Sequence, residues 1–157
     1  MGRLVAIVAC ATFVAVGCSS GGEQLTVEEY FAQLETISIE FDEAVPDIDF
    51  NDLDAVQAGF RTGRDANKDF VSALKSLSPP DELSDLHDQT VSDGEAALDD
   101  LNEFVDRVLD AGSVDELESI FTDIDALSAS SDTFTDRCLD LEEAASGAGI
   151  EIELRCG

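Results

Sequence analysis

Apolar residues recur every three or four positions along most of the chain from residue 26 onwards. Because a helix turns by about 100° per residue, this spacing gathers them on one helical face. The pattern predicts four helices, over about residues 26–45, 53–77, 81–111 and 113–146. Their stripes include Val27, Tyr30, Phe31, Leu34, Ile37, Phe41 and Val45; Leu53, Val56, Phe60, Phe70, Val71, Leu74 and Leu77; Leu83, Leu86, Val91, Leu98, Leu101, Phe104, Val105 and Val108; and Leu117, Ile120, Phe121, Ile124, Leu127, Phe134, Cys138, Leu141 and Ala145.

Helix-start and helix-stop residues fall where these stripes are interrupted. Thr26 and Ser113 are each followed three residues later by glutamate, which is the pattern of a capping box. Pro46 and the Pro79-Pro80 pair end the first two helices, and Gly112 ends the third. The stretch 128–131 is rich in serine, and the fourth helix is expected to kink or split there. Short turns between long helices favour an all-α fold, a four-helix up-down bundle.

The period changes from about 3.6 to 2 in the last residues. Ile150, Ile152, Leu154 and Cys156 would lie on one side of an extended segment. The sequence offers no second strand to pair with it. We therefore predict a short extended C-terminal tail that packs across the bundle.

The N-terminus follows a different pattern. Arg3 is the only charged residue among the first 22, and the run Leu4–Val16 that follows contains Thr12 as its only polar residue. A run of this length is typical of the hydrophobic region of a signal peptide, and it is too short to cross a bilayer as a helix.

This run ends in Ala15-Val16-Gly17-Cys18, which resembles the lipobox of bacterial lipoproteins, with Ala15 where leucine is usual. The resemblance implies that Cys18 is the lipid-attached first residue of the mature chain. It divides the sequence into a signal peptide (1–17), a lipidated cysteine with a flexible tether (18–25) and a helical domain (26–157). The mature protein would then be exported and anchored by lipid to the cell membrane or outer membrane, facing away from the cytoplasm.

Two alternatives were weighed for this segment. A lipobox ending at Cys10 would leave a hydrophobic region of only about six residues, below the usual minimum. An ordinary secretory signal peptide would instead leave Cys18 as a free thiol. If Cys10 leaves with the signal peptide and Cys18 takes the lipid, Cys138 and Cys156 remain, and outside the cytosol such a pair is expected to form a disulfide.

The chain is strongly acidic, with 36 acidic and 8 basic residues and a formal net charge of −28. Loss of Arg3 with the signal peptide leaves 7 basic residues and a charge of −29. Such a chain is repelled by nucleic acid and by anionic head groups, so neither is an expected partner, and membrane contact is expected through the lipid alone. The acidity suits either solubility in a saline surrounding or binding of divalent cations.

The best candidate for a cation site follows Pro46. Asp47, Asp49 and Asn51 begin like an EF-hand loop, in which alternating side-chain oxygens bind Ca²⁺. The sixth position is Asp52 instead of glycine and the twelfth is Ala58 instead of glutamate, so a complete EF-hand is rejected. Weak Ca²⁺ binding is the functional hypothesis, and capping of the next helix by aspartate is the structural alternative.

Two clusters of charged residues differ from the general distribution of acidic residues along the chain. Arg61, Arg64, Lys68 and Lys75 form a basic ridge on the second helix, suited to interhelical ion pairs or to a small anionic ligand. The third helix carries an acidic run, which is either a solvated face or a surface for a cationic protein partner: Asp93, Glu95, Asp99, Asp100, Glu103, Asp106 and Asp110.

Catalytic motifs are absent from the sequence. His87 is the only histidine, it adjoins the apolar stripe, and we interpret it as a boundary residue. No nucleophile elbow, haem attachment motif or paired-histidine zinc motif is present. The sequence thus favours a non-enzymatic interaction or structural module of the cell envelope without a cofactor and with no identified small-molecule ligand. The alternative is a Ca²⁺-binding protein that uses residues 47–54.

Overall fold

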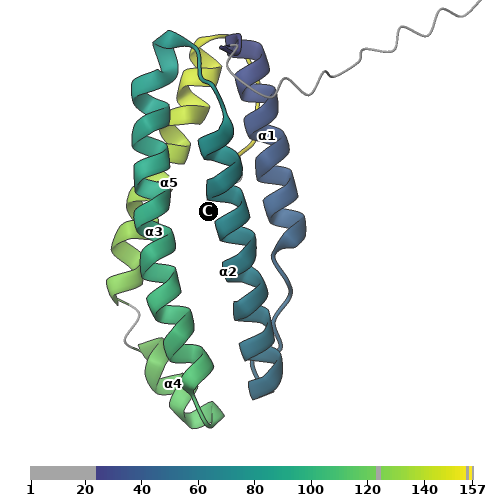
Figure 1. Ribbon diagram of the computed structural model, residues 1–157, viewed down its shortest axis with the longest axis vertical. Helices are drawn as coiled ribbons and strands as arrows, with labels where there is room; N and C mark the ends of the chain where they lie inside the picture. The colour runs from purple at the N-terminus through teal and green to yellow at the C-terminus, as the bar shows by residue number, and fades with distance from the viewer. Residues whose placement is uncertain (1–23, 123–124, 155, 157) are drawn as a thin grey trace, which may run out of the picture.

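The computed structural model describes residues 24–122, 125–154 and 156. Within these residues the chain is all-helical and contains no strand (Figure 1). The helices, in chain order, are α1 (Val27–Ala44), α2 (Leu53–Ser76), the short 3₁₀ helix η1 (Asp81–Leu83), α3 (Ser84–Asp110), α4 (Val114–Thr122) and α5 (Asp125–Gly147).

The helix starts follow the predicted chemistry. The Thr26 side chain accepts from the backbone N–H of Glu29, and the Glu29 carboxylate accepts from the N–H of Thr26, so the first capping box is confirmed. Ser113 likewise accepts from the N–H of Glu116, whose carboxylate turns to the N–H of Gly112. These contacts satisfy N–H groups that have no partner within the helix.

The predicted fourth helix is divided into α4 and α5, and the division comes earlier than the serine-rich stretch suggested. Thr122 is the last residue of α4, whereas residues 128–131 lie inside α5. The Thr122 hydroxyl donates to the backbone carbonyls of Glu118 and Ser119.

Helix α3 packs against α2 on one side and against α5 on the other, and α1 packs against α2. The core has two clusters. The first joins α1, the end of α2, η1, α5 and the C-terminal tail through Tyr30, Phe31, Leu34, Leu74, Leu77, Leu83, Leu141, Ala145 and Leu154. The second joins the start of α2, the end of α3 and α4 through Val56, Phe104, Val108, Ala111 and Leu117.

Two glycines allow close packing. At Gly59 in α2, the side chain of Ile48 in the α1–α2 connection lies 2.6 Å from where a Cβ would lie. Gly94 on α3 gives room to Phe134 on α5, whose ring would lie 3.1 Å from an added Cβ. Gly63 has no atom within 4 Å of that position, so it permits no close approach.

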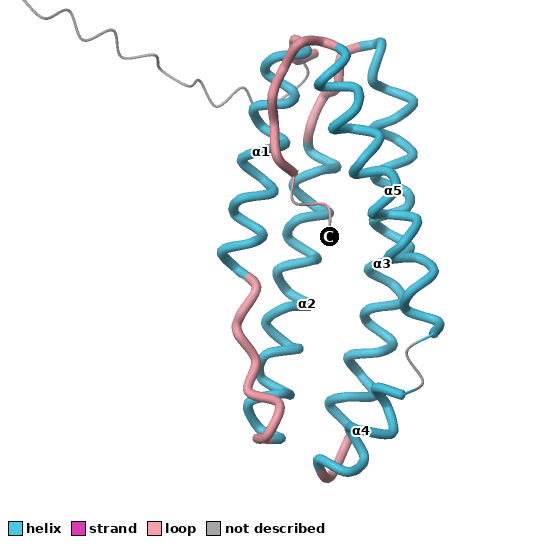
Figure 2. Tube along the Cα trace, turned by 180° about the vertical axis from the view of Figure 1, so that it is seen from behind, coloured by secondary structure: helices cyan, strands magenta, loops and turns pink. Residues whose placement is uncertain are grey.

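The C-terminal tail is extended and packs on the bundle, as its period predicted. Figure 2 shows it turning back from the end of α5 and running beside α1. Ile150, Ile152 and Cys156 pack against the first core cluster and Leu154 is buried in it. Cys138 and Cys156 form a disulfide, with their Cα atoms 5.5 Å apart.

Loss of this disulfide is predicted to lower the free energy of unfolding substantially. The bridge closes a loop between residues 18 apart in sequence, and a loop of this size corresponds to about 3 kcal/mol. Urea unfolding of the Cys138→Ser/Cys156→Ser protein should show this loss, and reduction of the wild-type protein should reproduce it. A loss below about 1 kcal/mol in both experiments would contradict the prediction.

Candidate functional site

Cys18, the predicted lipid attachment site, lies outside the described residues. The described chain starts beside the α2–α3 connection. The Gln24 amide nitrogen lies 2.6 Å from an Asp81 carboxylate oxygen, and the N–H of Leu25 donates to the carbonyl of Ser78 at 2.9 Å. The chain therefore enters the helical domain at the end of the molecule opposite α4 (Figure 1).

The structure shows the loop of the predicted cation site in detail. One Asp49 carboxylate oxygen accepts from both the backbone and the side-chain nitrogen of Asn51, each at 3.0 Å. These hydrogen bonds lower the pKa of Asp49. Asp52 caps α2 by accepting from the N–H groups of Asp54 and Ala55. Asp47 is exposed beside this turn.

The residues of this loop thus have structural partners of their own. Among the residues that the structure describes, no group of three or more His, Cys, Asp or Glu side chains is arranged to hold a metal ion. Asn51 turns its amide towards Asp49 instead of sharing an open centre with it. Ca²⁺ binding by Asp47, Asp49 and Asn51 stays a prediction.

An aromatic cluster next to this loop has no counterpart in the sequence analysis. Phe50 is 56% exposed, and its ring lies edge-on to that of Phe121 in α4, with centroids 6.0 Å apart. Phe121 in turn contacts Phe60 and Phe104, each at 5.7 Å. Phe60, Phe104 and Phe121 belong to the predicted apolar stripes and were expected in the core. Phe50 lies between helices, where periodicity carries no information, so the sequence did not predict its contact.

The basic ridge divides into pairs with α3 and exposed residues. Arg64 forms an ion pair with Asp106 at 3.0 Å, and Lys75 forms one with Glu95. Arg61 and Lys68 are exposed. The ridge therefore joins α2 to α3 through two interhelical ion pairs, which was the structural alternative to an anion site.

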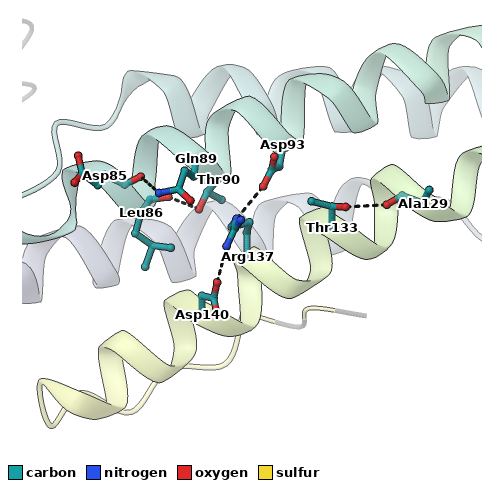
Figure 3. Close-up of polar contacts among 9 residues, drawn as sticks. All are labelled: Asp85, Leu86, Gln89, Thr90, Asp93, Ala129, Thr133, Arg137 and Asp140. Carbon is teal, nitrogen blue, oxygen red and sulfur yellow. Dashed lines mark hydrogen bonds and ion pairs between the residues drawn. The ribbon is translucent and has the colours of Figure 1, made fainter.

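The acidic run of α3 is only partly a solvated face, because Asp93, Glu95 and Asp106 all pair with cations. Asp93 accepts from Arg137 of α5 at 2.9 Å, and Arg137 also pairs with Asp140 at 2.9 Å (Figure 3). These two carboxylates raise the pKa of Arg137. The sequence analysis did not single out Arg137.

His87 is buried, with 4% of its surface exposed, and not at a boundary as predicted. Its Nδ1 lies 3.1 Å from the hydroxyl oxygen of Tyr30 on α1. Burial lowers the pKa of His87, partly opposed by the charge of Asp88, and burial raises the pKa of Tyr30. The contact between His87 and Tyr30 therefore joins α3 to α1 inside the protein.

The position of His87 follows from the width of the buried face of α3. At about 100° per residue, His87 and Gly94 lie between Leu86 and Val91 on the helix circumference. Leu86 and Val91 are only partly buried, on the two flanks of this face. The apolar residues of this half of α3 mark the edges of the buried arc, and its centre is polar or small.

A small cavity lies under the tail, with a volume of about 20 Å³. Leu34, Phe70, Leu74, Phe134, Leu141 and Leu154 are among its apolar lining residues, and Ser38 and Thr90 also line it. Ligand pockets for small molecules usually measure roughly 300–1,000 Å³. This cavity has room for about one water molecule.

The comparisons with known proteins assign no family to this arrangement. No protein-family model matches the chain, and neither a curated protein nor a solved structure is similar to it. In the part of the chain that the structure describes, none of the helices is both long and apolar enough to cross a membrane.

The buried His87 is predicted to make the fold less stable as the pH falls below about 6.5. The pKa of His87 in the folded protein lies below its ordinary value of 6.5. As the pH falls, the unfolded chain therefore binds a proton before the folded protein does. The free energy of unfolding that is present above pH 6.5 is lost as the pH falls towards the folded-state pKa. The slope can reach about 1.4 kcal/mol per pH unit. Urea midpoints between about pH 5 and 7.5 measure it.

The matched control is His87→Gln, which retains a polar side chain that does not titrate. Because His87 is the only histidine in the chain, this variant should lose most of the slope in that pH range. Equal slopes in the two proteins would assign the pH dependence to the carboxylates and contradict the prediction.

Salt is predicted to stabilise the helical domain through general screening. Most of the carboxylates are exposed, and their mutual repulsion is reduced by any added ion. Melting midpoints of residues 18–157 should rise equally in CaCl₂ and in NaCl of the same ionic strength. A further, saturable rise in CaCl₂ that disappears in Asp47→Ala/Asp49→Ala would instead establish the Ca²⁺ site.

Proposed function

We propose that this protein is a lipoprotein of the bacterial cell envelope, anchored through a lipid on Cys18, whose helical domain acts as a non-enzymatic interaction module outside the cytoplasm. The observation that carries the proposal is the sequence Ala15-Val16-Gly17-Cys18, whose first two residues close the apolar run Leu4–Val16. A small residue before the cysteine is what cleavage and lipid attachment at Cys18 require.

The disulfide supports an address outside the cytoplasm. Cys138 and Cys156 lie at bonding distance, and such bridges persist mainly in oxidising compartments. The net charge of −28 supports a domain that stays away from anionic head groups and meets its partners in solvent. An anchor made of lipid is compatible with both features.

We also infer that the helices form an up-down bundle in which α4 and α5 together take the place of the fourth helix. The pairing of α1 with α2, α2 with α3 and α3 with α5 supports this plan. The helical domain would then comprise residues 26–157, and residues 18–25 would connect it to the lipid. The entry of the chain beside Ser78 and Asp81 would direct this end of the bundle towards the membrane.

Replacement of Cys18 by serine is predicted to abolish anchoring. A bacterium that expresses the full chain and is fed a radioactive fatty acid should label the wild-type protein but not Cys18→Ser. Wild-type protein should also sediment with membranes and leave them only in detergent. Cys10→Ser is the matched control, and it should be labelled like the wild type.

Two results would count against this proposal. Label retained in Cys18→Ser but lost in Cys10→Ser would move the attachment site to Cys10. Wild-type protein without label, recovered as soluble exported protein, would indicate an ordinary secretory signal peptide.

A further inference from the structure

The end of the molecule formed by α4 and the start of α2 carries an exposed apolar surface. Phe50 projects from the α1–α2 connection onto Phe121, and Val114 is 38% exposed at the start of α4. Val114 and Phe121 are seven residues apart, so they lie within about 20° of each other on the helix. We call these three residues the apolar tip.

The apolar tip is supported from below by a packed core. Phe121 rests on Phe60 and Phe104, and Ile48 is held against Gly59 two residues before Phe50. Phe50 therefore stands on an ordered base and is not a side chain of a free chain end. Aromatic side chains held in a fixed position are well suited to act as anchors for a partner protein.

The residues around the apolar tip are acidic and therefore favour a partner with positive charge. Residues 45–60 and 108–122 contain no lysine or arginine, and Arg61 and Arg107 directly adjoin these stretches. Eight exposed acidic residues lie in these two stretches: Asp47, Asp49, Asp52, Asp54, Asp110, Asp115, Glu116 and Glu118. An apolar centre with an acidic rim complements a basic, amphipathic segment, which would place its apolar side chains on Phe50 and its lysines or arginines on the rim.

We propose that the apolar tip is a docking surface for a basic amphipathic segment of another protein. This inference deepens the interaction role proposed above, and it rests on the proposed lipid anchor for the direction in which the apolar tip faces. Helix α3, with 27 residues, separates the tip from the anchored end by about 40 Å. A second copy of this chain is the less favoured occupant, since two surfaces of the same negative sign would meet. An anionic membrane surface is disfavoured for the same reason.

The experiment uses residues 18–157 with Cys18→Ser, whose cooperative melting is checked first, and a synthetic amphipathic helical peptide of leucine and lysine. A peptide of the same composition in scrambled order serves as the control for charge alone. Titration followed by amide chemical shifts should perturb residues 48–54 and 113–122, and binding of the ordered peptide should exceed that of the scrambled one. Part of this difference should persist at high salt, since apolar contacts are not screened.

Matched variants test which exposed apolar side chains contribute to binding of the peptide. Phe50→Ser removes the exposed anchor, whereas Leu139→Ser changes a side chain that is 50% exposed on α5, away from the tip. We expect Phe50→Ser to weaken binding about tenfold and Leu139→Ser to leave it within about twofold, with both melting midpoints near the wild-type value. Val114→Ser, at the other side of the tip, should also weaken binding.

The outcomes separate this inference from the proposed function. Equal binding of both peptides, equal effects of the two variants, or shifts confined to the acidic residues of α3 would overturn the docking surface, although lipid labelling at Cys18 would still support anchoring. Self-association with shifts at the tip would replace the cationic partner with a second copy of the chain. Absence of lipid label would overturn the anchoring while leaving the peptide result as it stands.

Discussion

The C-terminal tail, fixed by the Cys138–Cys156 disulfide, is the constraint on which the arrangement of the helices depends. Leu154 is buried between α1 and α5, and both of its backbone polar groups have partners there. Its N–H donates to Glu142 of α5 at 2.8 Å, and its carbonyl accepts from Ser38 of α1 at 2.6 Å. A buried backbone group without a partner costs about 1–3 kcal/mol, so these two hydrogen bonds favour the packing of α1 and α5 on the tail.

The few basic residues are placed where helices meet, which limits the cost of so much negative charge. Arg64 and Lys75 connect α2 to α3, and Arg137 connects α5 to α3. Each of these pairs is partly exposed, and such pairs contribute about 0–1 kcal/mol. They are therefore too weak to determine the fold. Their effect is to relieve repulsion on α3, the helix that both neighbours contact.

Periodicity predicted what depends on local sequence. The stripes of α1 and α2, the capping box at Thr26 and the packed tail followed from spacing alone, because each depends on residues only a few positions apart. The burial of His87 could not be predicted in this way, since its partner Tyr30 lies 57 positions earlier. The role of Gly94 could not be predicted either, because the room that it leaves is filled by the distant residue Phe134. Nor could the position of Phe50, whose contact with Phe121 joins a loop to a distant helix. Val45 shows the converse, because it fits the stripe of α1 but is exposed just beyond the last turn.

The two ends of the molecule are stabilised by different means. The first core cluster contains the disulfide and the tail, whereas the second is held by apolar packing around Val56 and Leu117. Its main polar link is Gln57 of α2, whose side-chain nitrogen donates to the carbonyls of Val108, Leu109 and Ala111. These carbonyls lie at the C-terminus of α3, where the last turn has few backbone donors, so Gln57 caps α3 from a neighbouring helix. The Val108 carbonyl also accepts from the N–H of Ala111. The covalent cross-link thus supports the end where the chain enters the domain, and the end that bears Phe50 depends on side-chain packing.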